Sequence, residues 1–495
     1  MLKPKFETYR YVGEVCRLKS QSMVECRLSG SEIGSILAVY ANATPLESVC
    51  VDGGMQYKGR LTLLVTYEDS ERKLCRVERG AEFYHKAEGE AVAPSCFAKT
   101  AFRCENVTWR REGSGLYISV VVGAENTVYG SRQTDYLSGG DGLIVKTETV
   151  KAYKSICVSG DTEDEDEFEL DYVCDVLSHS ENVIVNGAYA SGGQIEVEGE
   201  ICLHLCVLKG EDGVCSYERL IPFKSTIPCE DGYGNITAGA KARVFNSHVS
   251  AQVDEEKGNS KILFSFGVHT DCDFAVCDDL TIVSDLFSPL VETFPKKKKE
   301  GGRYLSNQIK CVERVSGTAI LSPQNEGEYT LLASLLPRAE ITCRKGERGM
   351  EAEGVILAEV LLGGADGSTR SSTLTLPFVF PIECDGEEFE ADAVVCGLNV
   401  RRKKNGETEA EATLKVSVRS FETRSWEYVC DIVEGEEYGE EECAFSVFLT
   451  NAGEDLWQVA KRLRRAPEEL QKSNPELVFP LKEGERICVY RQIKG

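Results

Sequence analysis

YKGRLTLLVTY, residues 57–67, decides the fold, because its pattern occurs three times in the chain. The second copy is VEGEICLHLCV at 197–207, and the third is AEGVILAEVLL at 352–362. Each copy places a charged residue and a glycine before a run of alternating or continuous apolar residues, which is typical of a partly or fully buried strand. The sequence therefore predicts the same strand in three copies of one β-rich unit.

A phenylalanine follows the glycine of every copy at a constant distance. Phe83, Phe223 and Phe378 each lie 24 residues after that glycine. The second and third copies also share a proline and a cysteine at matching positions. Landmarks kept in register over such distances indicate an internal repeat.

Strands at short spacing, joined by turns that contain Gly or Asn, predict a β-sandwich or barrel-like module for each copy. No helix of normal length is evident before about residue 450. The fold class is therefore predicted to be mainly β, with three tandem modules and a different C-terminal domain. The predicted organisation is an N-terminal strand or linker at 1–30, modules at 31–160, 168–294 and 303–433, and the C-terminal domain at 443–495. Charged runs near the borders, at 161–167, 295–302 and 434–442, are interpreted as solvated linkers or tails.

Composition excludes several classes of partner. A formal net charge of −25 over 495 residues argues against general nucleic-acid binding and against docking on anionic lipid. The first residues have no apolar core like that of a signal peptide, and no run of about 18 apolar residues predicts a transmembrane segment. A cytosolic location is expected, where most of the 21 cysteines should be free thiols. Later oxidation into intermolecular bridges is the alternative.

Few residues suggest a catalytic or metal-binding site. Cys202, His204 and Cys206 alternate along one strand, so they share a face and could suggest zinc. The matching positions of the other copies hold Thr, Leu and Glu, so a half-exposed sheet face is the preferred interpretation. The five histidines form no recognisable nucleophilic signature, and no phosphate-binding loop is present. We therefore expect no catalytic residue, no metal and no cofactor.

The last fifty residues change in character. Apolar residues at 456, 459, 460 and 463 have helical spacing, and acidic residues precede them. A second helix is predicted to begin at Pro467 and to stop at Asn474-Pro475. With a strand on each side, at 444–449 and 486–490, the order is β-α-α-β. Residues 443–495 hold nine Lys and Arg against seven Asp and Glu, so this domain is slightly basic on an acidic chain.

This domain resembles a LysM domain, through Leu456-Trp457-x-Val459-Ala460, Leu470, Asn474-Pro475 and Leu481-Lys482-x-Gly484-x-x-Ile487-x-Val489. The family binds N-acetylglucosamine polymers such as peptidoglycan, in a groove between the loop before the first helix and the loop after the second. The groove residues that the resemblance implies are Gly453, Glu454, Asp455, Trp457, Asn474, Pro475, Glu476 and Leu477. The family's usual Gly-Asp-Ser/Thr is replaced here by Gly453-Glu454-Asp455. Two adjacent acids favour a protein partner with basic or amide donors over a neutral sugar.

A LysM domain at the end of repeated β modules makes the whole chain similar to the SPOCS-domain proteins of spore-forming clostridia, and to their SipL-like spore-coat morphogenetic group. The repeated strand with its glycine and the later Pro-Phe segment carry this resemblance. It implies a non-enzymatic scaffold in the mother-cell cytoplasm, at the forespore surface and spore coat. It also implies that the LysM domain docks the ATPase of the coat's basement layer.

Two alternatives stay open. One is a self-assembling coat or exosporium protein cross-linked through its cysteines, with other coat proteins or its own copies as partners. The other is a true peptidoglycan-binding protein. The oligomeric state and the division of labour among the three modules are not predicted.

Overall fold

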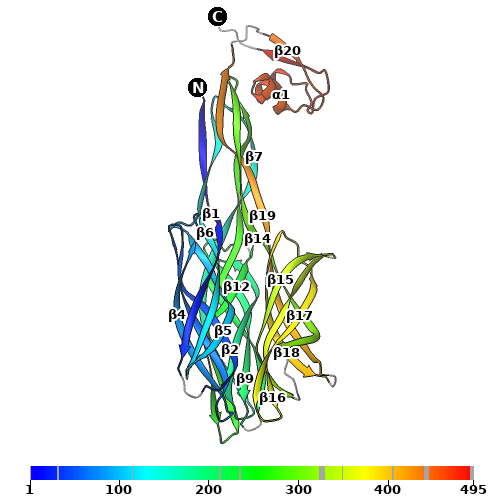
Figure 1. Ribbon diagram of the computed structural model, residues 1–495. Coiled ribbons are helices and arrows are strands. Elements are labelled where there is room, and N and C mark those ends of the chain that lie inside the picture. The colour runs from blue at the N-terminus through cyan, green and yellow to red at the C-terminus, as the bar shows by residue number, and fades with distance from the viewer. Residues whose placement is uncertain are drawn as a thin grey trace.

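The computed structural model of the chain describes residues 2–29, 33–113, 115–210, 213–233, 236–322, 329–347, 349–403, 406–439 and 445–490. Strands make up almost all of the described body, and two short helices lie near the C-terminus (Figure 1). The predicted mainly β fold class is thus confirmed. The body is elongated, with a broad lower part, a narrow upper stalk and the helical unit at its tip (Figure 1).

The strands fall into three consecutive sets. Set 1 comprises β1 (Lys3–Leu28), β2 (Ser35–Val51), β3 (Gly54–Glu68), β4 (Leu74–Glu88), β5 (Phe97–Glu112) and β6 (Gly115–Asp141). Set 2 comprises β7 (Ile144–Leu170), β8 (Asp175–Ser191), β9 (Gln194–Leu208), β10 (Val214–Pro228), β11 (Ile236–Thr237), β12 (Gly239–Asp254) and β13 (Asn259–Phe287). Set 3 comprises β14 (Val291–Ser322), β15 (Tyr329–Gly346), β16 (Gly349–Gly364), β17 (Thr369–Ile382), β18 (Glu388–Arg402) and β19 (Thr408–Glu437).

All three sets pair their strands in the same way. The long first strand pairs with the last strand, which also pairs with the strand before it, as in β1-β6-β5, β7-β13-β12 and β14-β19-β18. The three strands between them form an antiparallel meander: β2-β3-β4, β8-β9-β10 and β15-β16-β17. Set 2 adds the short β11 beside β8, and in set 3 the two sheets are joined where β14 meets β17. The repeated strand of the sequence is the central strand of each meander.

The constant distance between glycine and phenylalanine has a physical cause. In each meander the phenylalanine lies directly across from the glycine, as for Gly59 with Phe83, Gly199 with Phe223, and Gly354 with Phe378. A Cβ on these glycines would lie 2.4, 2.4 and 2.7 Å from the facing ring. The ring therefore covers a strand glycine from the neighbouring strand, a known way to stabilise glycine in a sheet.

Each set buries an apolar core between its two sheets. Leu61, Leu63 and Val65 of β3 face Ile118 and Val120 of β6 in set 1. Sets 2 and 3 repeat this arrangement, with the apolar residues of β9 against those of β13, and those of β16 against those of β19. Alternation along the repeated strand thus places one face of the meander in the core.

The stalk takes one strand pair from every set: β1 with β6, β7 with β13, and β14 with β19 (Figure 1). Its interior holds an aromatic cluster in which Tyr9 and Tyr136 of set 1 meet Trp426 of set 3, with ring centroids 6.4 and 6.3 Å apart. Ala152 and Ile282 of set 2 are buried in the same cluster. The three sets therefore share one core in the stalk.

Below the stalk, a network of charged side chains joins the three sets. Lys99 of set 1 lies 3.3 Å from Asp273 of set 2, which also contacts the fully buried Arg419 of set 3 at 3.2 Å. Arg419 also forms an ion pair with Glu390, and Glu390 lies 3.0 Å from Lys241 of set 2. Burial opposes ionisation of Glu390, but the charges of Arg419, Lys241 and Arg303 hold its pKa well below its usual range.

The charged runs that we expected to be linkers lie largely within strands, so this interpretation was wrong. Residues 161–167 belong to β7, residues 295–302 to β14, and residues 434–437 to β19. Their charges pair across neighbouring strands: Lys296 lies 2.9 Å from Asp431, and Lys261 lies 2.6 Å from Glu167. Opposite charges on facing strands stabilise an exposed sheet face, which a local sequence pattern does not distinguish from a linker. Residues 440–442 and the predicted start of the C-terminal domain at 443 lie outside the described residues.

The opening segment, predicted as an introductory strand or linker, is the long strand β1, and it pairs with β6 along most of its length. No helix in the described part of the chain is long and apolar enough to span a membrane.

Candidate functional site

The C-terminal unit consists of β20 (Phe445–Leu449), α1 (Leu456–Leu463), α2 (Pro467–Ser473) and β21 (Arg486–Tyr490). The predicted strand-helix-helix-strand order is thus observed. The buried face of α1 consists of Val459, Ala460 and Leu463, and α2 begins with Pro467 in its first turn, as the sequence predicts. These helices pack on β20 and β21 through a core that includes Leu470, Leu481, Ile487 and Val489.

The segments before α1 and after α2 lie side by side. The Gly453 amide donates to the Leu481 carbonyl at 2.8 Å, and the Leu481 amide donates to the Glu454 carbonyl at 2.9 Å. Gly453 has φ of +85°, in the left-handed region that favours glycine. Gly453 and Glu454, on one side of the predicted groove, therefore lie beside Leu481, which follows the residues of the other side in the sequence.

Both groove carboxylates have partners within the unit. Asp455 caps α1 by accepting from the Gln458 amide at 2.7 Å, and the Gln458 side chain completes a capping box. Glu454 accepts from Asn451 at 2.8 Å and from Arg462 at 2.9 Å. We expected the two acids to face donors of a partner, but Asp455 caps the start of α1 and Glu454 binds Asn451 and Arg462 of the same unit.

Trp457 contacts the body of the chain. Its Nε1 donates to Asp285 Oδ2 at 2.8 Å, and its ring packs edge-on against Phe287 with 5.3 Å between centroids. Lys461, one helical turn later, contacts the other oxygen of Asp285 at 2.5 Å. Burial opposes ionisation of Asp285, but the hydrogen bonds from Lys461 and Trp457 lower its pKa. These contacts hold the α1 face of the unit against the end of β13.

The remaining groove residues divide into two groups. Asn474 is buried, donates to the carbonyls of Leu470 and Cys488 at 2.9 and 2.8 Å, and accepts from the Cys488 amide at 2.7 Å. It therefore ties α2 to β21. Leu477 packs partly into the core, whereas Gly453, Pro475 and Glu476 are exposed. Of these three exposed positions of the predicted groove, Glu476 alone has a polar side chain.

A surface that sequence reasoning missed lies on the outer face of β20 and β21. Phe445, Val447, Leu449 and Tyr490 are 50, 49, 63 and 64% exposed. Phe445 pairs with Tyr490 across the two strands, with ring centroids 5.1 Å apart. We call these four residues the apolar strip. The alternation of apolar residues at 445, 447 and 449 was the available signal, because Phe448 between them faces the core.

Cys202, His204 and Cys206 lie on a buried face, so the prediction of a half-exposed face was wrong. They are 1, 5 and 2% exposed, because this side of the set 2 meander packs against set 3 and, around Cys206, also against set 1. A strand whose two faces are both covered shows no alternation that would reveal the second contact. No group of three or more potential metal ligands occurs among the residues that the structure describes.

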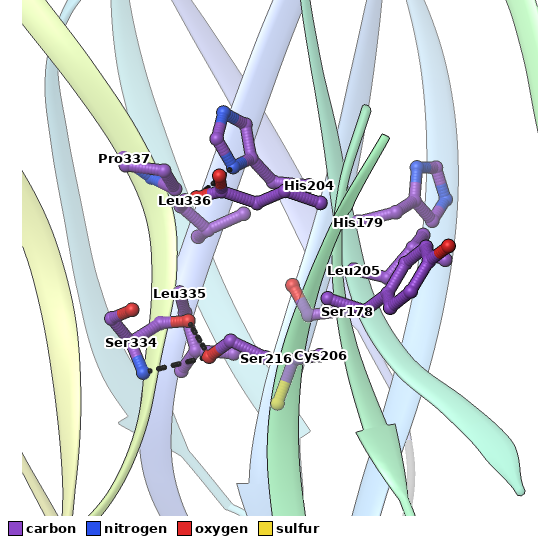
Figure 2. Close-up of a pocket in the computed structure, with 12 residues that line it drawn as sticks. Ser178, His179, His204, Leu205, Cys206, Ser216, Ser334, Leu335, Leu336 and Pro337 are labelled. Carbon is purple, nitrogen blue, oxygen red and sulfur yellow. Dashed lines mark hydrogen bonds and ion pairs between the residues drawn. The ribbon is translucent and has the colours of Figure 1, made fainter. Parts of the chain in front are cut away.

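His204 stands at the boundary between sets 2 and 3, beside a small cavity (Figure 2). Its Nε2 lies 2.8 Å from the Val395 carbonyl and 3.3 Å from Cys202 Sγ, and its Nδ1 lies 3.1 Å from Glu218. A nitrogen that contacts a carbonyl oxygen at this distance carries a proton, so it is not free to act as a base towards Cys202. The adjoining cavity of about 10 Å³ has room for roughly one water.

Ser216 of β10 and Ser334 of β15 close the opposite side of this cavity (Figure 2). Ser216 Oγ donates to the Ser334 carbonyl at 2.8 Å and accepts from the Ser334 amide at 3.0 Å. The arrangement fastens two sheet edges to each other. The Cys-His-Glu cluster at this boundary thus has the geometry of a packed interface.

The chain has no detectable relatives in the three comparisons made with known proteins: no family model, no curated protein and no solved structure matches it.

Proposed function

We propose that the chain is a non-enzymatic assembly scaffold, in which a β body carries a LysM-like unit at its tip for docking to a protein partner. Three strand sets with one pairing scheme support the interpretation as tandem β modules of the SPOCS type. Tyr9, Tyr136 and Trp426 tie these sets into one stalk, which favours a spacer over three independent domains. The strand-helix-helix-strand order supports the LysM part of the proposal.

The observation that carries the docking proposal is the apolar strip. Four large apolar residues, about half exposed or more, lie on one face of a two-stranded sheet at the far end of the molecule, together with their cross-strand neighbours Cys488 and Arg486. A contiguous apolar patch of this kind is a mark of protein-protein contact, and Tyr and Phe are enriched at the centre of such contacts. The face opposite the helices is therefore the proposed docking surface.

The family resemblance supplies the partner. In the proposal, the strip binds the ATPase of the spore coat's basement layer, and the chain acts in the mother-cell cytoplasm at the forespore surface. The excess of basic over acidic residues in 443–495 supports an acidic or mixed partner surface, because the rest of the chain is strongly acidic. In this proposal the exposed groove residues Gly453, Pro475 and Glu476 are not part of the docking surface.

The test compares two matched valines in the full-length chain. Val447→Glu puts a charge on the strip, and Val253→Glu puts the same charge on a valine of β12 that is 47% exposed, against 49% for Val447. We expect Val447→Glu to weaken capture of the purified ATPase at least tenfold and to abolish forespore localisation of a fluorescent fusion, while Val253→Glu leaves both unchanged. Capture unaffected by Val447→Glu contradicts the proposed surface.

A third variant separates the strip from the LysM groove. Glu476→Gln changes an exposed groove residue without touching the strip. If the chain is instead a peptidoglycan binder, wild-type protein sediments with purified cell wall as strongly as a standard LysM protein, and Glu476→Gln alters that binding. If it is a cross-linked lattice protein, spore extracts show ladders on gels that disappear with reductant.

A further inference from the structure

Two cysteines from different strand sets meet at the boundary between sets 2 and 3. Cys202 lies on β9 and Cys396 on β18, and Cys396 packs against the apolar cluster that contains Cys202. Cys202 Sγ also lies 3.4 Å from the carbonyl of Val395, the residue before Cys396. Cys202 packs with Ile184 and Val394 in a small apolar cluster that Cys396 borders. The two thiols are thus held in place by packing from both sides.

The pKa values of the two thiols shift in opposite directions. The interaction with Cys202 lowers the pKa of Cys396; burial opposes this, the positive charge of Lys415 adds to it, and the carboxylates of Glu218 and Glu200 oppose it. The same interaction, together with burial, raises the pKa of Cys202. Lys415 is held beside Glu200 by an ion pair, and His204 contacts Cys202 at 3.3 Å. The thiolate is the reactive form of cysteine, and Cys396 is the more exposed of the two sulfurs, so a dissolved oxidant meets Cys396 first.

Cys396 can also be reached from solvent. It is partly exposed, whereas Cys202 is buried. The next residue, Gly397, lines a cleft of about 690 Å³ between β10 and set 3, together with Glu218, Arg314 and Glu411. Gly397 has φ of +123°, and the register of β18 against β19 shifts between Val395 and Leu398. This irregular segment places the partly exposed Cys396 directly before a residue that lines the cleft.

We propose that Cys202 and Cys396 are an oxidation site, at which hydrogen peroxide forms a disulfide that locks set 2 to set 3 within one chain. The thiolate of Cys396 attacks one peroxide oxygen, the O–O bond breaks, and the other oxygen leaves as water after taking a proton. The Cys202 thiol then attacks the sulfur of the resulting sulfenic acid. The S–O bond breaks, a second water leaves, and the S–S bond forms. Two thiols are oxidised and one peroxide is reduced to two waters.

This site is independent of the docking proposal and of an intermolecular lattice. The cross-link closes a loop of 194 residues between two separately paired sheets, so it restricts the unfolded chain strongly. The cross-link is expected to stabilise the body of the scaffold against unfolding without joining one molecule to another. The signature is therefore an intramolecular bridge, seen at dilute protein concentration.

The test maps disulfides in full-length wild-type protein after exposure to hydrogen peroxide, by mass spectrometry of a digest prepared without reductant. We expect a linked peptide pair containing Cys202 and Cys396 in most molecules, and a thermal midpoint a few degrees higher than that of the reduced protein. Cys277 is exposed and serves as an internal control for exposure to the oxidant. Oxidised Cys277 with no Cys202–Cys396 bridge overturns the proposal, as does a bridge from Cys396 to any other cysteine.

Two variants complete the design. Cys396→Ser removes the reactive sulfur at a partly exposed position, and is expected to abolish both the linked peptide and the rise in thermal midpoint. Cys272→Ser changes a buried cysteine of β13 outside this pair, and is expected to leave both intact. A rise in midpoint that persists in Cys396→Ser shows that the bridge is not its cause. The wild-type peptide map decides the question even where a variant folds poorly.

Discussion

Phe223 lies directly across from Gly199 in the set 2 meander, with its ring where a Cβ on that glycine would stand. The same pair occurs in the meanders of sets 1 and 3. The glycine leaves the space, and the ring of the neighbouring strand fills it. One packing device thus fixes the pairing of two strands in all three sets, and it explains why the sequence keeps glycine and phenylalanine 24 residues apart.

Gly199→Ala is expected to lower the stability of the body by about 1–3 kcal/mol, the usual cost of overpacking a core. A Cβ at this position meets the Phe223 ring at 2.4 Å and the Ile184 carbonyl at 2.6 Å. Gly80→Ala on β4 is the matched control, because nothing lies within 4 Å of its added Cβ. The thermal midpoint measures both. Equal midpoints for the two variants contradict the proposed role of the ring.

Arg419→Met is expected to destabilise the folded chain by about 3–5 kcal/mol, because it removes a buried charge and leaves the partly buried carboxylates of Asp273 and Glu390 without their main partner. Lys19→Met breaks the exposed pair with Glu125 and should cost about 1 kcal/mol or less. Thermal unfolding and limited proteolysis compare the two variants. A loss for Arg419→Met as small as that for Lys19→Met refutes the idea that the network joins the three sets.

The same network predicts how stability depends on pH. The folded-state pKa of Glu390 lies below its unfolded value, so its contribution is fully present above about pH 5 and is lost as pH falls through the folded pKa. The thermal midpoint of the wild type should therefore fall progressively below about pH 5. Glu390→Gln should be less stable than the wild type at pH 7, and its midpoint should fall less steeply with acid. Parallel pH profiles for the two proteins would rule this out.

Asp285→Asn is expected to loosen the C-terminal unit from the stalk, because the neutral amide loses the ion pair with Lys461 and is a weaker acceptor for Trp457. Hydrogen-deuterium exchange should increase in α1 while the strand sets stay protected. Asp279→Asn, at an exposed position of the same strand, is the control and should change nothing in α1. Unchanged exchange in Asp285→Asn shows that other contacts hold the unit.

Local patterns predicted the local features well. The helices at 456–463 and 467–473 follow from apolar spacing and from Pro467, and the central strands follow from their repeated glycine. The errors come from contacts between distant parts of the chain. The charges at 295–302 resemble a linker because their partners on β19 lie more than a hundred residues away. Trp457 and Asp285 are 172 residues apart, so no motif around the tryptophan reveals what covers it.

The apolar strip and the buried face that carries Cys202 both show that a sequence pattern does not reveal which strand faces are covered. Phe445, Val447 and Leu449 alternate as a half-buried strand should, yet the sequence does not say which face is covered. Cys202 and His204 lie on a strand that is covered twice, once by its own set and once by the next. Periodicity reports that a face is apolar, but only the assembled fold decides what packs against it.

The stalk has a consequence for the order of events during synthesis. Its interior needs Tyr9 from the first strand and Trp426 from the last long one, so it closes only when almost the entire chain has left the ribosome. Asp285, at the end of β13, gains its partner Trp457 only after the C-terminal unit has been synthesised. A chain that ends before β19 lacks both the complete stalk and the C-terminal unit. The residues of the proposed docking surface, on β20 and β21, are therefore made after all the strands of the stalk.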